Sequence, residues 1–180
     1  LRAMTKQPLS CSMEELQAAE DVLDTVQERF NVRPDVLSYN IVIDAWAKSN
    51  VHDAANRAEE LLDIMERRYP SALAPDSYTY TSVINAIDRS RHVKARGSWA
   101  EDIMNRMKEM HTKGLVEQPT TAVYNALLNC LVRSGENGAI ERAEALFSNL
   151  ESSTGLVNTR TYNTMLKRYA TFARNVTMVR

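Results

Sequence analysis

Four short segments of the 180-residue chain repeat one another, and this self-similarity constrains the fold more than any other feature of the sequence. Each segment contains a tyrosine, and the tyrosines recur at intervals of roughly 40 residues, a period typical of helical repeats. Apolar residues stand three, four and seven positions after each tyrosine, as in the set Tyr39, Val42, Ile43 and Trp46. The spacing predicts four amphipathic helices of one kind, with tyrosines Tyr39, Tyr80, Tyr124 and Tyr162.

A second set of helical segments alternates with the first. Each carries an alanine followed by glutamate and then apolar residues at the same spacing; the alanines are Ala19, Ala58, Ala100 and Ala143. Three of the four tyrosines are preceded by a proline five residues earlier, where it ends one helix and precedes the next: Pro34, Pro75 and Pro119. One helix pair cannot bury its own apolar stripe, whereas stacked pairs cover one another. The sequence therefore predicts an all-α superhelix, or α-solenoid, of tandem helix–turn–helix repeats.

We expect a single repeat array over residues 1–180. Its units are a half repeat at 13–30, full repeats at 35–75, 76–119 and 120–157, and a half repeat at 158–174. Neither end carries the polar capping helix that closes a complete solenoid. We therefore expect the chain to be a fragment of a longer protein.

Composition and motifs argue against several classes of function. The net charge of −1, from 22 basic and 23 acidic residues, indicates no nucleic-acid partner by itself and counts mildly against one. No apolar run approaches the roughly 20 residues that span a bilayer. The three histidines lack the spacing of metal ligands, and no phosphate-binding glycine loop or nucleophile motif is present. We therefore expect no enzyme, cofactor, metal site, small-molecule substrate or membrane association.

The helix boundaries resemble those of a known family. Pro34-Asp35 leading to Ser38-Tyr39-Asn40, and the run Arg142-Ala143-Glu144-Ala145-Leu146-Phe147, are similar to the boundary and interior motifs of pentatricopeptide repeats. The resemblance extends over about residues 13–172. It implies single-stranded RNA binding at about one base per repeat. It further implies a role in organellar RNA processing, stability or translation, in a mitochondrion or plastid.

The resemblance also implies which residues read bases. The residue after each tyrosine would act with the residue after the next boundary proline, which gives the pairs Asn40 with Asp76, Thr81 with Thr120, and Asn125 with Asn158, and leaves Asn163 without a partner in the chain. The first pair implies uridine. The third pair implies a pyrimidine, with cytidine preferred to uridine, and the threonine pair implies no particular base. Residues two before the tyrosines would sandwich the bases: Leu37, Tyr78 and Ala122.

A basic column supports RNA binding without the family resemblance. Lys48, Arg89 and Arg133 each stand nine residues after a tyrosine and would contact phosphates. The run from Arg89 to Arg96 adds local positive charge, and its other interpretation is a solvated loop. Two alternatives stay open: a protein-binding α-solenoid of the tetratricopeptide type, which the near-neutral charge favours, and a plain capping role for the asparagines at the helix starts.

Overall fold

The computed structural model describes residues 12–68, 73–153 and 155–177. Within these ranges the chain forms α-helices and no strand. The helices are α1 (Met13–Phe30), α2 (Val36–Lys48), α3 (Ala54–Arg68), α4 (Ser77–Arg89), α5 (Arg96–Thr112), α6 (Thr121–Ser134), α7 (Ala139–Ser153) and α8 (Thr159–Thr177).

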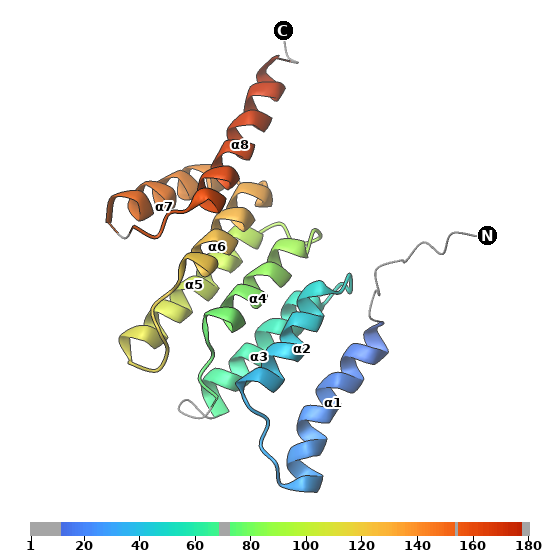
Figure 1. Ribbon diagram of the computed structural model, residues 1–180. Helices are drawn as coiled ribbons and strands as arrows, with labels where there is room; N and C mark the ends of the chain where they lie inside the picture. The colour runs from blue at the N-terminus through green and yellow to red at the C-terminus, as the bar shows by residue number, and fades with distance from the viewer. Residues whose placement is uncertain (1–11, 69–72, 154, 178–180) are drawn as a thin grey trace, which may run out of the picture.

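The helices stack in chain order as a two-layered solenoid (Figure 1). The first-helix layer consists of α2, α4, α6 and α8, which pack against one another in series. The second-helix layer consists of α1, α3, α5 and α7; α3 packs against both α2 and α4, and α5 against both α4 and α6. This arrangement confirms the predicted all-α helical repeat architecture.

Short polar side chains begin the helices of the first-helix layer, directly after the boundary prolines. Asp35 accepts a hydrogen bond from the Ser38 backbone N–H at 2.8 Å, and hydrogen bonding by Ser38 lowers the pKa of the Asp35 carboxyl. Asp76 accepts from the Thr79 backbone N–H at 2.8 Å, while the Thr79 hydroxyl accepts from the Asp76 backbone at 3.1 Å. Such caps satisfy backbone donors that the helix itself leaves unpaired, so each proline–cap step fixes where a first helix starts.

The apolar stripes fill the core as their spacing predicts. Trp46, Ile43, Tyr80 and Ile84 are fully buried, and the matching positions Leu128 and Leu131 of α6 are equally inaccessible. On α8 the stripe is only partly covered, since Met165 is buried while Tyr162, Leu166 and Tyr169 are exposed. A stripe is thus fully buried where helices pack on both sides of it, as α1 and α4 do on α2 and as α2 and α6 do on α4.

The second-helix layer is joined across repeats by a recurring polar contact. In three of the second helices, the residue before the repeated alanine donates a hydrogen bond to a glutamate of the preceding second helix. That glutamate directly follows the repeated alanine of its own helix. The three contacts are Arg57 to Glu20, Trp99 Nε1 to Glu59 at 2.8 Å, and Arg142 Nε to Glu101 at 3.1 Å. Equivalent positions therefore make equivalent contacts at three successive junctions, which fixes the register of one repeat on the next.

The largest polar cluster of the second-helix layer centres on Arg106 of α5. Its guanidinium group bonds to Glu59 at 2.8 Å and Glu66 at 2.6 Å, and also to Asp63, all on α3. The Glu66 carboxylate also accepts from the Tyr80 hydroxyl at 2.9 Å. One cation thus holds three partly buried carboxylates of the preceding repeat together.

We predict that Arg106→Ala lowers the free energy of unfolding by about 2–3 kcal/mol, because it leaves three partly buried carboxylates without their cation. The matched control is Arg67→Ala, which removes an exposed partner of the same Asp63 and should cost less than about 0.5 kcal/mol. Urea titrations of the two variants measure the difference. Equal losses would show that the cluster does not join the repeats.

Candidate nucleic-acid interface

The first predicted base-reading pair meets across a repeat junction. Asn40 lies in the second turn of α2 and donates through Nδ2 to the Asp76 carboxylate, the cap of α4, at 3.3 and 3.4 Å. The Thr79 hydroxyl donates to Asn40 Oδ1 at 2.7 Å. Asn40 is only 6% exposed, whereas Asp76 is exposed. Asn40 therefore contacts the next repeat and does not cap its own helix.

The third predicted pair has the same arrangement with different chemistry. Asn125 of α6 donates through Nδ2 to Asn158 Oδ1 at 3.4 Å. Asn158 accepts from the Thr161 backbone N–H at 3.1 Å, as Asp76 does from Thr79. Asn125 Oδ1 is buried without a hydrogen-bond partner, because the Thr161 hydroxyl bonds to Asn158 instead. The junction keeps its geometry while leaving one amide oxygen unsatisfied.

The second predicted pair is not joined by a hydrogen bond. The Thr81 hydroxyl donates to the Ser77 carbonyl of its own helix at 2.6 Å, and Thr120 begins α6 without a side-chain cap bond. Asn163 is exposed on α8. The structure therefore brings together two of the three predicted pairs.

The residues predicted to sandwich bases lie on the surface at the starts of the first helices. Leu37 is 64% exposed and Tyr78 is 52% exposed, and Ala122 is exposed as well. Ile41, one turn after Leu37, is 61% exposed. Exposed large apolar side chains such as Leu37, Tyr78 and Ile41 are typical of a surface that receives flat or apolar groups.

The three basic residues of the predicted column stand in series at the C-terminal ends of α2, α4 and α6. Two are paired with carboxylates, because Lys48 contacts Asp44 on its own helix and Arg133 contacts Asp88 on α4. The hydrogen bond with Asp44 raises the pKa of Lys48, which keeps its amine charged. Arg89 instead donates to the Ala47 carbonyl at 2.6 Å. The i,i+4 spacing of Asp44 and Lys48 was the one sequence signal for these partners.

The basic run that follows α4 divides into two parts with different environments. Arg96 is 9% exposed and donates to the Asp88 carbonyl at 2.7 Å and the Arg133 carbonyl at 2.9 Å, so it caps the ends of α4 and α6. Arg91 and His92 are exposed. Sequence reasoning treated the run as one solvated charge patch, which is wrong for Arg96.

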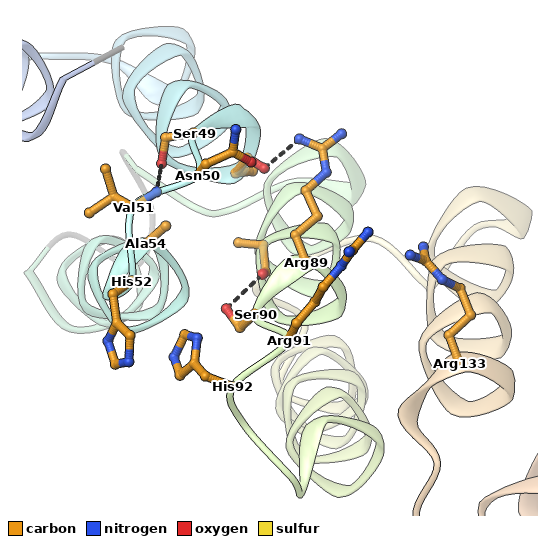
Figure 2. A pocket seen from close by; sticks show the side chains of 12 residues that line it. Ser49, Asn50, Val51, His52, Ala54, Arg89, Ser90, Arg91, His92 and Arg133 are labelled. Atoms are coloured by element: carbon orange, nitrogen blue, oxygen red, sulfur yellow. Dashed lines mark hydrogen bonds between the residues drawn. The ribbon is translucent and has the colours of Figure 1, made fainter. Parts of the chain in front are cut away.

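These basic side chains border a hollow that sequence reasoning did not foresee. It has a volume of about 620 Å³ and lies where α2, α4 and α6 end (Figure 2). Arg89, Arg91 and Arg133 line it together with His52 and His92, whose rings stack with centroids 3.6 Å apart. We call it the arginine hollow.

Charge is distributed unevenly between the two layers. The described side chains of the first-helix layer include two acidic residues, Asp44 and Asp88, against six basic ones: Lys48, Arg89, Arg133, Arg160, Lys167 and Arg168. In the second-helix layer, α1 alone carries the acidic residues Glu14, Glu15, Glu20, Asp21, Asp24 and Glu28. The near-zero net charge therefore conceals a basic layer and an acidic layer.

Other kinds of site find no support in the part of the chain that the structure describes. No group of three or more His, Cys, Asp or Glu side chains there could hold a metal ion. None of the helices described is long and apolar enough to cross a membrane. Cys130 is fully buried, as its small-residue register predicts, and burial raises the pKa of its thiol to about 12.

Comparison with known proteins finds similarity to one repeat family. A model of the PPR repeat family matches residues 34–87, which contain the first junction with Asn40 and Asp76. The chain is 26% identical over 156 residues to a chloroplastic pentatricopeptide repeat-containing protein of Arabidopsis thaliana. The match covers 86% of this chain and 18% of that relative, so the chain spans under a fifth of the relative's length.

The buried Asp88 carboxylate yields a prediction about pH. Burial raises the pKa of the Asp88 carboxyl above its ordinary value, and the cations Arg133 and Arg96 oppose this only in part. The folded state thus favours the protonated acid. The contribution of the Asp88 carboxyl to the free energy of unfolding therefore falls as the pH rises from about 4 through the folded-state pKa. We predict that Asp88→Asn raises the free energy of unfolding at pH 7 by about 1 kcal/mol, because it removes the buried charge.

The measurement is urea unfolding of both proteins at pH 7 and at about pH 4, where the difference should vanish as Asp88 takes up its proton. A variant that is less stable than the parent at pH 7 would contradict the prediction. It would mean that the ion pair with Arg133 outweighs the burial of the carboxylate.

Proposed function

We propose that the chain is an organellar RNA-binding protein of the pentatricopeptide repeat family, and that its first-helix layer binds single-stranded RNA at about one base per repeat; the matches to the family model and to the chloroplastic relative support this. It does so without catalysis, in RNA processing, stability or translation within a mitochondrion or plastid. The observation that carries the proposal is the pair Asn40–Asp76, joined across the first junction and repeated as Asn125–Asn158.

The geometry of the junctions suits an extended strand. Packed helices lie roughly 8–10 Å apart, so equivalent residues on neighbouring first helices are separated by about that distance. Stacked bases within a nucleic-acid strand are only roughly 3.4 Å apart. A strand that places one base at each junction must therefore be unstacked, and exposed side chains such as Leu37 and Tyr78 can replace the lost base–base contacts.

The polar pairs supply hydrogen-bonding groups for the base edge. The Asp76 carboxylate offers only acceptors, whereas Asn158 offers both a donor and an acceptor. A uracil edge presents an N–H that a carboxylate can accept, and a cytosine edge presents an amino group and acceptors that suit an amide. We assign uridine to the first junction. To the third junction we assign a pyrimidine, with cytidine preferred to uridine. The threonine pair at the second junction assigns no base.

A protein-binding scaffold of the tetratricopeptide type is the second candidate function. The pairing of Lys48 and Arg133 with carboxylates favours it, as does the exposed apolar side chain of Ile41. RNA titrations separate the two functions, because only RNA binding depends on releasing counterions from phosphates.

We predict that the combined substitutions Lys48→Gln, Arg89→Gln and Arg133→Gln reduce the magnitude of the slope of log affinity against log salt concentration by about 2. Each phosphate contact with a single strand contributes about 0.7 to that magnitude. Pyrimidine-rich oligonucleotides titrated at two salt concentrations measure the slope. The matched control, Arg29→Gln, Arg67→Gln and Lys108→Gln, removes the same charge from the second-helix layer and should leave the slope unchanged.

Thermal melting of both triple variants verifies that they remain folded. Equal slopes for the parent and the first-helix variant would refute phosphate contact by these residues. Failure of the parent to bind any single strand at low salt would overturn RNA binding itself and leave the scaffold function.

We predict that Asp76→Asn changes the base preferred at the first junction from uridine towards cytidine, because it makes that pair chemically identical to Asn125–Asn158. Asparagine caps helices about as well as aspartate, so the start of α4 and overall stability should be preserved. Oligonucleotides that differ at one position should show a change in preference of roughly five- to tenfold, with overall affinity retained. An equal loss of affinity for all sequences would contradict a reading role for this pair.

A further inference from the structure

The arginine hollow, formed by the ends of three first helices and two interhelical turns, lies apart from the base-reading pairs. Those pairs are at the starts of the same helices, and Asn40 precedes the end of α2 by eight residues, or about 12 Å of helix. Figure 2 shows the side chains of Arg89, Arg91 and Arg133 extending to the same side of α4, towards the space between α2 and α6. The hollow can therefore hold a group that the reading pairs do not contact.

The lining of the hollow is strongly basic. It includes three arginines and no carboxylate. Arginine stays protonated in proteins, and like charges gathered in one concavity repel one another. The Asp88 carboxylate pairs with Arg133 and also attracts Arg89 and Arg91, so its one charge offsets the three guanidinium groups only in part. The Arg91 guanidinium has no hydrogen-bond partner among the residues that the structure describes. An anion that enters the hollow relieves this repulsion.

Helix C-termini normally disfavour anions, because their last carbonyls point outward with partial negative charge. Here those carbonyls are already occupied. Arg89 bonds to the Ala47 carbonyl, the Ser49 hydroxyl bonds to the Trp46 carbonyl at 2.9 Å, and Arg96 bonds to the Asp88 carbonyl. The dipole ends of α2 and α4 are therefore screened from the hollow by positive and neutral donors.

Two histidines complete one wall of the hollow. His52 from the turn after α2 and His92 from the turn after α4 stack with an interplanar angle of 18°. Both side chains are exposed, and the His92 ring can donate an N–H to an oxyanion. His52 Nδ1 lies 3.3 Å from Asp53 Oδ1 on the side of its own turn. The pair thus ties two consecutive repeats together at the hollow.

We propose that the arginine hollow is a phosphate-binding site, in which Arg89, Arg91 and Arg133 hold the anion and His92, stacked on His52, donates from the side. A phosphomonoester carries a charge of about −1.5 to −2 at neutral pH and several strong acceptors, which suits three guanidinium groups. The same chemistry is presented by a terminal phosphate of RNA, by an internal diester and by free phosphate. Only the assignment of the phosphate to RNA rests on the proposed function.

The test uses the histidine ring signals of the whole chain in NMR spectra, since the chain has three histidines. Inorganic phosphate should shift the signals of His52 and His92 in a saturable way. His111, which contacts the Val116 carbonyl at the far end of α5, is the internal control and should not move. Absence of saturable shifts, or equal shifts of His111, would overturn the site.

A matched pair of variants ties the effect to the hollow. Arg91→Ala removes a lining cation, and phosphate should bind about tenfold more weakly, since a charge-assisted hydrogen bond is lost. Lys94→Ala removes the same charge from the same turn, outside the lining of the hollow, and should bind as the parent does. Equal affinities for Arg91→Ala and the parent would overturn the assignment.

Oligonucleotides with a 5′-phosphate, a 3′-phosphate or no terminal phosphate identify the source of the anion. Tighter binding of one phosphorylated end, lost in Arg91→Ala, assigns the hollow to that RNA end. Equal binding of all three strands, with equal loss in Arg91→Ala, assigns it to an internal phosphate. If no strand binds while inorganic phosphate still shifts His52 and His92, the RNA function fails and the phosphate site stands.

Discussion

Each first helix buries its apolar stripe only where helices of the preceding and following repeats pack against it, and the remaining features of the structure depend on this constraint. Tyr80 and Ile84 are inaccessible because α2 and α6 flank α4, whereas Tyr162 of α8 is 44% exposed. The same packing brings the cap of one first helix against the second turn of the previous one. The polar pair Asn40–Asp76 is thus a property of the junction, since neither repeat alone contains it.

The sequence was sufficient to predict those features that depend on short-range pattern. Tyrosine-anchored stripes and boundary prolines determine where helices start and which faces pack, so the solenoid was predictable. The contacts of Asn40 with Asp76 and of Asn125 with Asn158 join residues that the family resemblance had paired. The partners of the basic column were not predictable, since Arg133 meets Asp88 through packing of α6 on α4 and not through local spacing. Arg96 was misassigned for the same reason: its burial depends on carbonyls at the ends of two other helices.

The distribution of charge explains why composition was a poor guide to the ligand. A net charge of −1 argues against a nucleic-acid partner only if charges are mixed over the surface. Here acidic side chains gather in α1 and the rest of the second-helix layer, where Arg57, Trp99 and Arg142 use several of them as acceptors. Because the carboxylates that join the repeats lie in the second-helix layer, the first-helix layer keeps an excess of basic side chains.

The junction between Thr81 and Thr120 has a consequence for any target of the proposed kind. Its two side chains do not form a hydrogen-bonded pair, yet α4 and α6 pack there as closely as elsewhere in the series. If the proposed recognition holds, that repeat contributes length to the recognised sequence but little information. A gene carrying the target could therefore accept mutations at the central base without losing its binding protein, while the flanking positions would remain under selection.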